Sequence, residues 1–362
     1  MSSEEQRLRE LRERIDALDQ QIQELISQRA RCAQEVAAAK QQSGNHGSFY
    51  RPEREVDVLR RVVKRNQGPL SSEEMARLFR EIMSACLALE SPLHIAFLGP
   101  EGTFTQAAAL KHFGHSVRTL PFNAIDEVFR EVESGAVQFG VVPIENSTEG
   151  IINHTLDMFV NSPLRICGEV ELRIHHHLLA KGKSLKTIKK IVSHSQSLAQ
   201  CREWLDAHLP KLERVAVSSN AEAARLAAKD ARLAAIAGSS AADIYKLNVL
   251  TKNIEDEPDN TTRFLVVGRL ETQPSGADKT SMLVAGQNRA GALAALLAPF
   301  SRNQINMTRI ESRPSRKGLW EYVFFLDIDG HVKDERVIKA LDELAKEVAF
   351  MKLLGSYPKA VL

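Results

Sequence analysis

The sequence predicts three domains: an all-α domain, an α/β domain and a small domain with the element order βαββαβ. Three observations support this prediction. A long heptad pattern opens the chain, strand-turn-helix units recur through its middle, and alternating strand and helix segments of another order close it. At 362 residues the chain also exceeds what one hydrophobic core usually organises.

The first domain is predicted to be helical. From residue 8 to about residue 40, apolar residues recur at alternating steps of three and four, which indicates a heptad seam on one helix. A helix of that length, roughly 50 Å, is too long for its own small domain to cover, so we expect a helix of a second subunit to pack on it. Shorter helical patterns follow at 54–66 and, after the capping signal at 71–74, up to residue 90.

The middle of the chain is predicted to be α/β. Residues 95–98 are typical of a short buried strand, followed by a Gly/Pro turn and a helix. The same unit recurs in "GVVPIENSTEG", "KIVSHSQSLAQC", "VAVSSNAEAARLAA" and "LAAIAGSSAADIY". Such repetition predicts parallel strands. After a linker near residue 275, the remaining segments have the βαββαβ order of a ferredoxin-like regulatory module.

Composition limits the partners. Hydrophobic residues are 43%, charged residues 26% and the net charge +2, which gives no reason to expect nucleic acid or an anionic membrane. We therefore expect small-molecule partners and no cofactor. The four cysteines are far apart and predict neither disulfides nor a zinc site, and the N-terminus lacks the apolar core of a signal peptide. A cytoplasmic location is the expectation.

Charged side chains occupy core positions of the helical domain. These are Arg29, Lys40, Glu55 and Glu90. They form either a buried ion-pair network, a coiled-coil specificity device or the lining of a cavity for an anionic ligand. Arg and Lys bind carboxylates strongly where the dielectric is low, which supports the cavity.

The segments "LRERIDALD", "LISQRARCAQEVAAAK" and "YRPERE" resemble the all-helical chorismate mutase family over about residues 5–90. The resemblance implies that Arg12 reaches into the partner subunit's site of a homodimer. It also implies that chorismate is bound by Arg29, Lys40, Arg54, Glu55 and Glu90, with Lys40 and Glu90 catalytic. The family's pericyclic reaction needs no nucleophile, so cationic groups and hydrogen bonds are sufficient. Glu90 donates to an ether oxygen only when protonated; burial raises its pKa and cations lower it.

Hydroxyl and amide residues occupy the predicted turns of the middle domain. Singly each fits a helix N-cap, but together they place hydroxyls where α/β sheets bind anions. The motifs "FLGPEGTFTQAA", "VPIENSTEG", "VSHSQSLAQC" and "NTTRF" resemble prephenate dehydratase over about residues 93–270, a family with two lobes and a cleft between them. The implied substrate site comprises Thr103, Thr105, Asn146, Ser147, Thr148, His194, Ser195, Gln196, Thr262 and Arg263.

The implied second reaction removes the ring hydroxyl and carbon dioxide from prephenate. Because aromatisation makes it strongly downhill, a positioned proton donor is sufficient. Thr262 is expected to be the key hydroxyl, directing a hydrogen bond or relaying a proton, with Arg263 the adjacent cation at the cleft. Glu145 and His194 are alternative proton sources.

Three consecutive histidines at 175–177 invite a metal interpretation. Alternation along a strand places the first and third on one face, but no spacing supplies a third ligand. A strand surface explains the run as well, and no metal is predicted.

The segments "NRAGAL" and "ESRP" resemble the ligand motifs of the amino-acid-binding ACT domain, over about residues 278–362. The implied effector site comprises Asn288, Gly291, Ala292, Leu293, Glu311, Ser312, Arg313 and Pro314. Alone, these motifs also fit a helix cap and a strand-end turn. Beside the other two domains they imply phenylalanine feedback, with the ligand at a subunit interface.

Together these resemblances predict a bifunctional enzyme that converts chorismate to prephenate and then to phenylpyruvate and is inhibited by phenylalanine. The expected domains are residues 1–92, 93–272 and 278–362, in a homodimer or a higher oligomer. Two alternatives remain: a non-catalytic two-lobed ligand sensor, and a dehydratase whose helical segment only dimerises.

Overall fold

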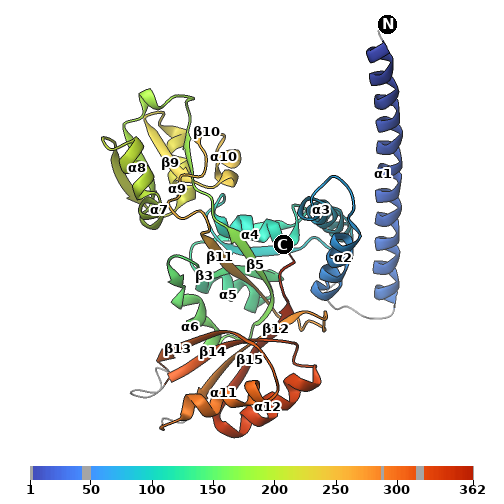
Figure 1. Cartoon of the computed structure of the whole chain (residues 1–362), viewed down its shortest axis with the longest axis vertical. Helices are drawn as coiled ribbons and strands as arrows, with labels where there is room; N and C mark the ends of the chain where they lie inside the picture. The colour runs from blue at the N-terminus through green and yellow to red at the C-terminus, as the bar shows by residue number, and fades with distance from the viewer. Residues whose placement is uncertain (1–2, 43–49, 287–288, 315–321, 362) are drawn as a thin grey trace.

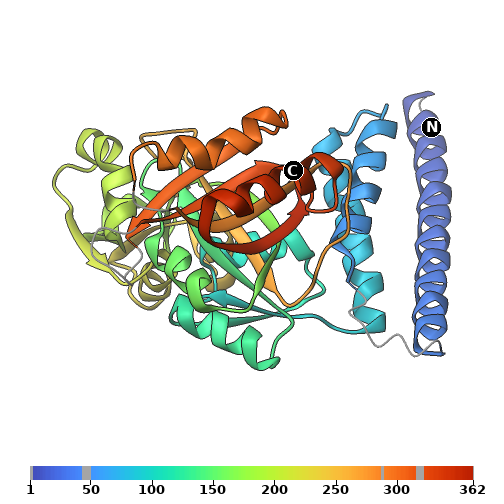
Figure 2. The same cartoon turned by 90° about the horizontal axis from the view of Figure 1, so that it is seen from below.

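The computed structural model describes residues 3–42, 50–286, 289–314 and 322–361. Figure 1 shows a central α/β lobe with a second lobe above it, a C-terminal sheet below it and the N-terminal helices to one side. Helix α1 is the outermost element in both views, beside α2 and α3 (Figures 1 and 2).

The predicted all-α domain consists of three helices. They are α1 (Ser3–Gln42), α2 (Pro52–Arg65) and α3 (Ser72–Glu90). The Ser71 side chain caps α3 by accepting a hydrogen bond from the Glu74 amide at 3.1 Å, as the capping signal predicted. The apolar stripe of α1 remains on the surface of this single chain, with side chains such as Ile15 and Leu25 55% and 63% exposed. The sequence "SGNHGS" at 43–48, which predicts the end of the first helix, lies outside the described residues.

The first α/β lobe contains a sheet with strand order β2-β1-β3-β11-β5, and β4 pairs with β3. Its strands are β1 (His94–Leu98), β2 (Arg118–Phe122), β3 (Phe139–Asn146), β4 (Gly150–Ile151), β5 (Arg165–Arg173) and β11 (Thr261–Gly268), and its helices are α4 (Phe104–Phe113), α5 (Ile125–Ser134) and α6 (Asn153–Asn161). Strands β2, β1 and β3 are parallel, as expected. Strand β11 is antiparallel to both neighbours because it enters the sheet on the return from the second lobe.

The second lobe contains a mixed five-stranded sheet of order β10-β6-β9-β7-β8. Its elements are β6 (His177–Ala180), a 3-10 turn (Leu185–Thr187), β7 (Lys190–His194), α7 (Ser195–Gln200), α8 (Arg202–His208), β8 (Glu213–Val217), α9 (Asn220–Lys229), β9 (Leu233–Ala237), α10 (Ser239–Tyr245) and β10 (Asn248–Thr251). Two crossing segments join the lobes and are hydrogen-bonded to each other, from the Ile174 amide to the Asn260 carbonyl and from the Ile254 amide to the His176 carbonyl, both at 2.8 Å.

The C-terminal domain has the predicted ferredoxin-like arrangement. Its elements are β12 (Asp278–Gly286), α11 (Ala292–Arg302), β13 (Met307–Pro314), β14 (Tyr322–Asp329), α12 (Glu335–Glu347) and β15 (Val348–Pro358), in the antiparallel order β13-β14-β12-β15. Helices α11 and α12 cover one face of this sheet. The other face shares a hydrophobic core with the first lobe, to which Phe325, Leu354 and Tyr357 contribute.

Strands β15 and β5 approach each other closely at Gly355, which has φ of 152°. A β-carbon at this position would lie 2.2 Å from the carbonyl oxygen of Ile166. Only glycine is compatible with both the backbone angle and the separation. The C-terminal sheet therefore packs on the first lobe backbone against backbone at this point.

Candidate active sites

The helical domain has a cavity of about 400 Å³ between its three helices. Five of the predicted chorismate-binding side chains line it: Arg29 and Lys40 from α1, Arg54 and Glu55 from α2, and Glu90 from α3. The charged residues on the helical seams thus surround one shared space. That space has the cationic lining needed to bind a carboxylate-bearing ligand.

Burial determines the protonation tendency of Glu90. It raises the pKa of this carboxyl, and the nearby cations Lys40 and Arg29 oppose the shift without reversing it. The net effect of burial and cations is therefore a raised pKa, which extends the pH range over which Glu90 is protonated. A protonated Glu90 can donate a hydrogen bond into the cavity.

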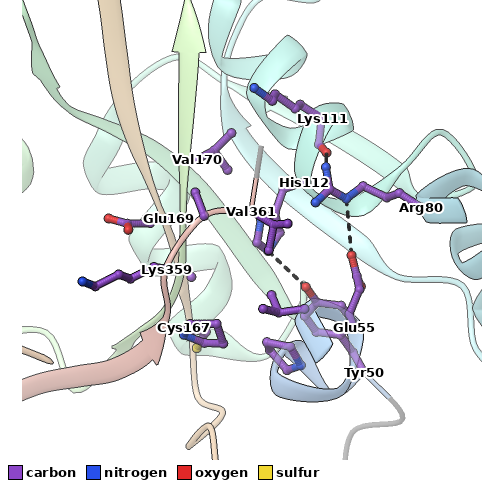
Figure 3. A pocket seen from close by; sticks show the side chains of 15 residues that line it. Tyr50, Glu55, Arg80, Lys111, His112, Cys167, Glu169, Val170, Lys359 and Val361 are labelled. Carbon is purple, nitrogen blue, oxygen red and sulfur yellow. Dashed lines mark hydrogen bonds and ion pairs between the residues drawn. The ribbon is translucent and has the colours of Figure 1, made fainter. Parts of the chain in front are cut away.

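Glu55 connects the helical cavity to the rest of the molecule. Burial raises its pKa to about 7, although Arg80 opposes the shift from 3.5 Å away. Figure 3 shows that Arg80 also donates to the carbonyl of Lys111 in α4, at 2.8 Å. Sequence reasoning did not identify Arg80, because its partners come from two domains.

The small cavity of Figure 3, about 30 Å³ in volume, lies where all three domains meet. The Tyr50 hydroxyl is 3.0 Å from His112 Nε2, and burial, reinforced by Arg80, lowers the pKa of His112 to about 3. The ring is therefore neutral, and it shares one hydrogen bond with the Tyr50 hydroxyl. The C-terminal segment that ends with Val361 lines the same space.

Arg12 lies on the exposed surface of α1, outside the cavity lining. It precedes Arg29 by about 25 Å along the helix axis, at 1.5 Å per residue. Arg12 cannot reach the cavity of its own chain.

A second cavity, of about 390 Å³, lies between the two α/β lobes. Four predicted residues line it: Asn146, His194, Gln196 and Thr262. Asn146 Nδ2 donates to Thr262 Oγ1 at 2.8 Å. Because the Thr262 oxygen accepts this bond, its own hydrogen remains available for another acceptor.

Five predicted residues of the dehydratase motifs do not line this cavity: Thr103, Thr105, Ser147, Thr148 and Ser195. Thr103 caps α4 and donates to the Leu98 carbonyl, while Thr105 is buried within the helix. Ser147 accepts a bond from the Thr261 amide, and the Thr148 amide donates to Asn146. Thr103 thus fits the N-cap alternative, and in this arrangement of the lobes none of the five side chains lines the cavity.

Arg263 lies on the opposite face of β11 from Thr262. It pairs with Glu169 at 2.9 Å and Asp327 at 2.7 Å and donates to the Tyr357 hydroxyl at 3.0 Å. The expectation of a cation at the cleft is therefore wrong in geometry. Successive residues of a strand point to opposite faces, so Thr262 in the cleft directs Arg263 toward the C-terminal domain.

The side chain of Glu145 also points away from the cleft, because side chains alternate between the two faces of a sheet. It is the register partner of Arg263, as Asn146 is of Thr262, and directly opposed residues share a face. Its carboxylate lies 3.5 Å from Arg309 of β13, outside the cavity lining. Of the two expected proton sources, His194 lines the cavity. Its Nδ1 accepts from the Gln196 amide at 3.4 Å, which leaves the proton of a neutral ring on Nε2.

Several polar side chains of the cleft are absent from the predicted substrate site, although Ser197 and Asn220 belong to the predicted turns. They are Glu149, His176, Ser197, Gln200 and Asn220. Gln200 lies one helical turn after Gln196 on α7, and this spacing was a usable signal. The others become neighbours only because the two lobes face each other.

The predicted effector residues lie on α11 and β13. Gly291 adopts a left-handed conformation, with φ of 79°, at the start of α11, and Ala292 and Leu293 follow it. Asn288 lies outside the described residues. On β13, Ser312 and Pro314 are exposed. Arg313 instead pairs with Asp157 of α6 at 2.6 Å, so its side chain faces the first lobe, which corrects the expectation of an effector contact.

The three histidines have separate partners. His175 pairs with Glu255, His176 with Gln200, and His177 accepts from the Asn253 amide. Among the described residues, no cluster of three or more His, Cys, Asp or Glu side chains is arranged to hold a metal ion. No helix within the described ranges is both long and apolar enough to span a membrane.

The fold and its two polar cavities define a multidomain enzyme that acts on small molecules. Three families match successive parts of the chain: chorismate mutase type II over residues 11–91, prephenate dehydratase over 95–272 and the ACT domain over 280–346. A bifunctional chorismate mutase/prephenate dehydratase from Pseudomonas aeruginosa is 59% identical over 365 residues, covering 99% of this chain and 100% of that protein. Its Escherichia coli counterpart is 33% identical and covers 96% and 95%.

Among solved structures, the prephenate dehydratase of Arthrobacter aurescens in complex with L-Phe is 38% identical, with a TM-score of 0.68. The match covers 74% of this chain and 90% of that one. The chain belongs to the family of bifunctional chorismate mutase/prephenate dehydratases. It is an enzyme of phenylalanine biosynthesis that converts chorismate to prephenate and prephenate to phenylpyruvate. Both alternatives, the non-catalytic ligand sensor and the dehydratase whose helical segment only dimerises, are thereby set aside.

Proposed function

We propose that the helical cavity binds chorismate through Arg29, Lys40, Arg54, Glu55 and Glu90. The observation that supports this assignment is the convergence of all five side chains on one cavity of about 400 Å³. Arg29 and Arg54 suit the substrate carboxylates, and Lys40 and protonated Glu90 suit the ether oxygen, where negative charge develops as the bond breaks. The enzyme holds the reactive conformer and stabilises the separating charges.

Replacing Glu90 by glutamine should change the pH dependence of the mutase. In the wild-type chain the raised pKa keeps Glu90 protonated to higher pH, and kcat/KM should fall as the pH rises through that pKa. Glutamine donates at every pH, so Glu90→Gln should flatten this alkaline limb. Steady-state kcat/KM between pH 5 and 9 measures it.

Glu55→Gln is the matched control, because the pKa of Glu55, about 7, is also raised by burial. The same falling limb in Glu90→Gln would remove Glu90 from this role. If the falling limb of kcat/KM disappears only in Glu55→Gln, the titrating group is Glu55.

We also propose that the chain is a homodimer in which Arg12 completes the partner's mutase site. The seam residues of α1, including Leu8, Ile15 and Ile22, are about half exposed in one chain. Removing the exposed part of each from water favours association by roughly 1 kcal/mol per side chain. Arg12 lies beside this seam, far from its own cavity.

Mixing two inactive variants tests this arrangement. Arg12→Ala and Lys40→Ala homodimers should each lack mutase activity. A mixed dimer would contain one intact site, with Arg12 from one chain and Lys40 from the other. Unfolding and refolding the equimolar mixture should restore about a quarter of wild-type mutase activity, since half the dimers are mixed and each has one working site. No recovery, with dimers shown by light scattering, would place Arg12 outside the site.

For the dehydratase, we propose that prephenate binds between the lobes with its ring hydroxyl at Thr262. Asn146 donates to the Thr262 oxygen, which directs the threonine hydrogen toward the cavity. That hydrogen bond assists the departing hydroxide. His194, which lines the same cavity, is the better placed proton source, because Glu145 is paired with Arg309 on the opposite face of the sheet.

Phenylalanine is the proposed effector of the C-terminal domain, by analogy with the L-Phe complex of the Arthrobacter enzyme. Gly291, Ala292, Leu293, Glu311, Ser312 and Pro314 are its proposed contacts. The proposed functional units remain residues 1–92, 93–272 and 278–362. The four cysteines are unpaired, which supports a reducing, cytoplasmic location.

A further inference from the structure

Asn260 occupies the point where the two crossing segments between the lobes touch. Its side chain is almost completely buried, with the residue 2% exposed, and its carbonyl accepts the hydrogen bond from Ile174. It stands two residues before Thr262 and therefore shares its face of the extended chain. A buried amide must satisfy its hydrogen bonds within the protein, so its partners reveal its role.

Backbone amides fix the orientation of the neighbouring Asn146. Its Oδ1 accepts from the amides of Thr148 and Glu149, both at 3.0 Å. That end must be the oxygen, because backbone N–H groups only donate. The two hydrogens on Nδ2 then go to Asn260 Oδ1 at 2.7 Å and Thr262 Oγ1 at 2.8 Å.

The same logic extends into the second lobe. Because Asn260 Oδ1 accepts, its Nδ2 donates to Gln200 Oε1 at 3.2 Å. Gln200 Oε1 is also 2.9 Å from His176 Nε2. The Gln200 Nε2 group donates to Glu149 Oε1 at 3.3 Å. Burial lowers the pKa of His176, so its ring is neutral and carries its proton on Nε2.

Asn260 is thus bonded to both lobes. Asn146 belongs to β3 of the first lobe, whereas Gln200 ends α7 of the second. A change in the distance between the lobes changes the hydrogen bond between Asn260 and Gln200. The bonds from Asn146 to Asn260 and to Thr262 then change with it. The donor and the acceptor of every hydrogen bond in this series follow from the two backbone amides that donate to Asn146.

We propose that Asn260 is a positioning residue of the dehydratase, which couples the arrangement of the lobes to the orientation of the Thr262 hydroxyl. The inference rests on the proposed role of Thr262. Without the Asn260 acceptor, one Asn146 hydrogen loses its partner. The Asn146 amide is then held only at its oxygen, by the amides of Thr148 and Glu149, and its nitrogen can tilt away from Thr262. The threonine hydrogen is then no longer directed at the substrate, which lowers kcat more than it raises KM.

The isosteric variant Asn260→Asp tests this role through pH. At neutral pH the introduced carboxylate accepts from Asn146 but cannot donate to Gln200, and we expect dehydratase kcat to fall about tenfold to a hundredfold. When protonated, the carboxyl has one acceptor and one donor, as asparagine does. The variant-to-wild-type ratio of kcat should therefore rise as the pH is lowered. The wild-type profile is measured in parallel as the reference, because His176 and Glu149 bond to the same Gln200 amide.

Two further variants complete the experiment on the full-length enzyme. Asn260→Ala lacks both donor and acceptor, and its kcat ratio should stay low at every pH. Asn248→Asp is the matched control in the second lobe, where the amide donates to the Lys181 carbonyl at 2.9 Å; its dehydratase kcat should remain near wild type. The mutase activity of each preparation reports that the helical domain is folded, and its circular dichroism spectrum reports that the other domains are folded.

Three results would overturn the inference: a wild-type kcat in Asn260→Asp, a rise in KM alone, or an equal loss of mutase and dehydratase activities with no recovery at low pH. The first excludes positioning, the second indicates direct substrate contact, and the third indicates a purely structural residue. Thr262→Val separates this inference from its premise. If that variant is inactive while Asn260→Asp is normal, only the role of Asn260 fails; if Thr262→Val is active, both fail.

Discussion

Replacing Thr262 by valine is expected to lower dehydratase kcat by about 10²- to 10³-fold while leaving the mutase activity of the same molecule unchanged. Valine keeps the β-branched shape that suits strand β11 and removes only the hydroxyl, so the loss would report the missing hydrogen bond to the leaving group. Dehydratase turnover and chorismate consumption, measured on one preparation, give the two activities side by side.

Thr261→Val is the matched control for this prediction. Thr261 is adjacent on the same strand, but its hydroxyl donates to the Asp259 carbonyl at 3.1 Å and it does not line the cavity. The control should retain both activities. Normal dehydratase turnover by Thr262→Val would remove that hydroxyl from the mechanism.

Replacing Arg263 by methionine is expected to lower the free energy of unfolding of the dehydratase and regulatory unit by about 3 to 5 kcal/mol. The Arg263 side chain is 12% exposed, and its partners Glu169 and Asp327 are 3% and 7% exposed. Removing the cation would leave Asp327 buried without its principal counter-charge, since Lys279 pairs with Glu169 instead. Denaturant unfolding followed by a probe in this unit measures the change.

Arg232→Met provides the comparison. Arg232 also pairs with an aspartate, Asp230, but its side chain is 74% exposed, so its loss should cost less than about 1 kcal/mol. A position of Arg263 between the domains and a position in the cleft predict different results for Arg263→Met. A cation in the cleft would raise KM for prephenate with little change in stability, and that outcome would refute the placement of Arg263 between the domains.

The helical domain was the most predictable part of the fold. The heptad pattern of α1 and the cap of α3 are local features, and each survives in the structure. Arg29, Lys40 and Glu90 could be selected because charges at core positions conflict with the pattern around them. The role of Arg80 could not be predicted from the sequence, because its partners Glu55 and Lys111 belong to different domains.

The dehydratase cleft shows where sequence reasoning ends. Motif resemblance selected Asn146, His194 and Thr262, and all three line the cavity. It also selected Arg263, although strand alternation alone excludes that residue from the face occupied by Thr262. The contacts of Asn260 depend on the meeting of two lobes, and the antiparallel entry of β11 depends on a return over a long stretch of chain. Neither has a local signature.

The contact at Gly355 has a mechanical consequence. Side chains can change rotamer and absorb a small displacement, but peptide groups in direct apposition cannot. Any tilt of the regulatory sheet at this point therefore displaces β5, and with it β11, which pairs with β5 along its whole length from Thr261 to Gly268. The contact between the two sheets is made by main-chain atoms, so a displacement of the C-terminal sheet can reach the strand that carries Thr262 without rearrangement of side chains.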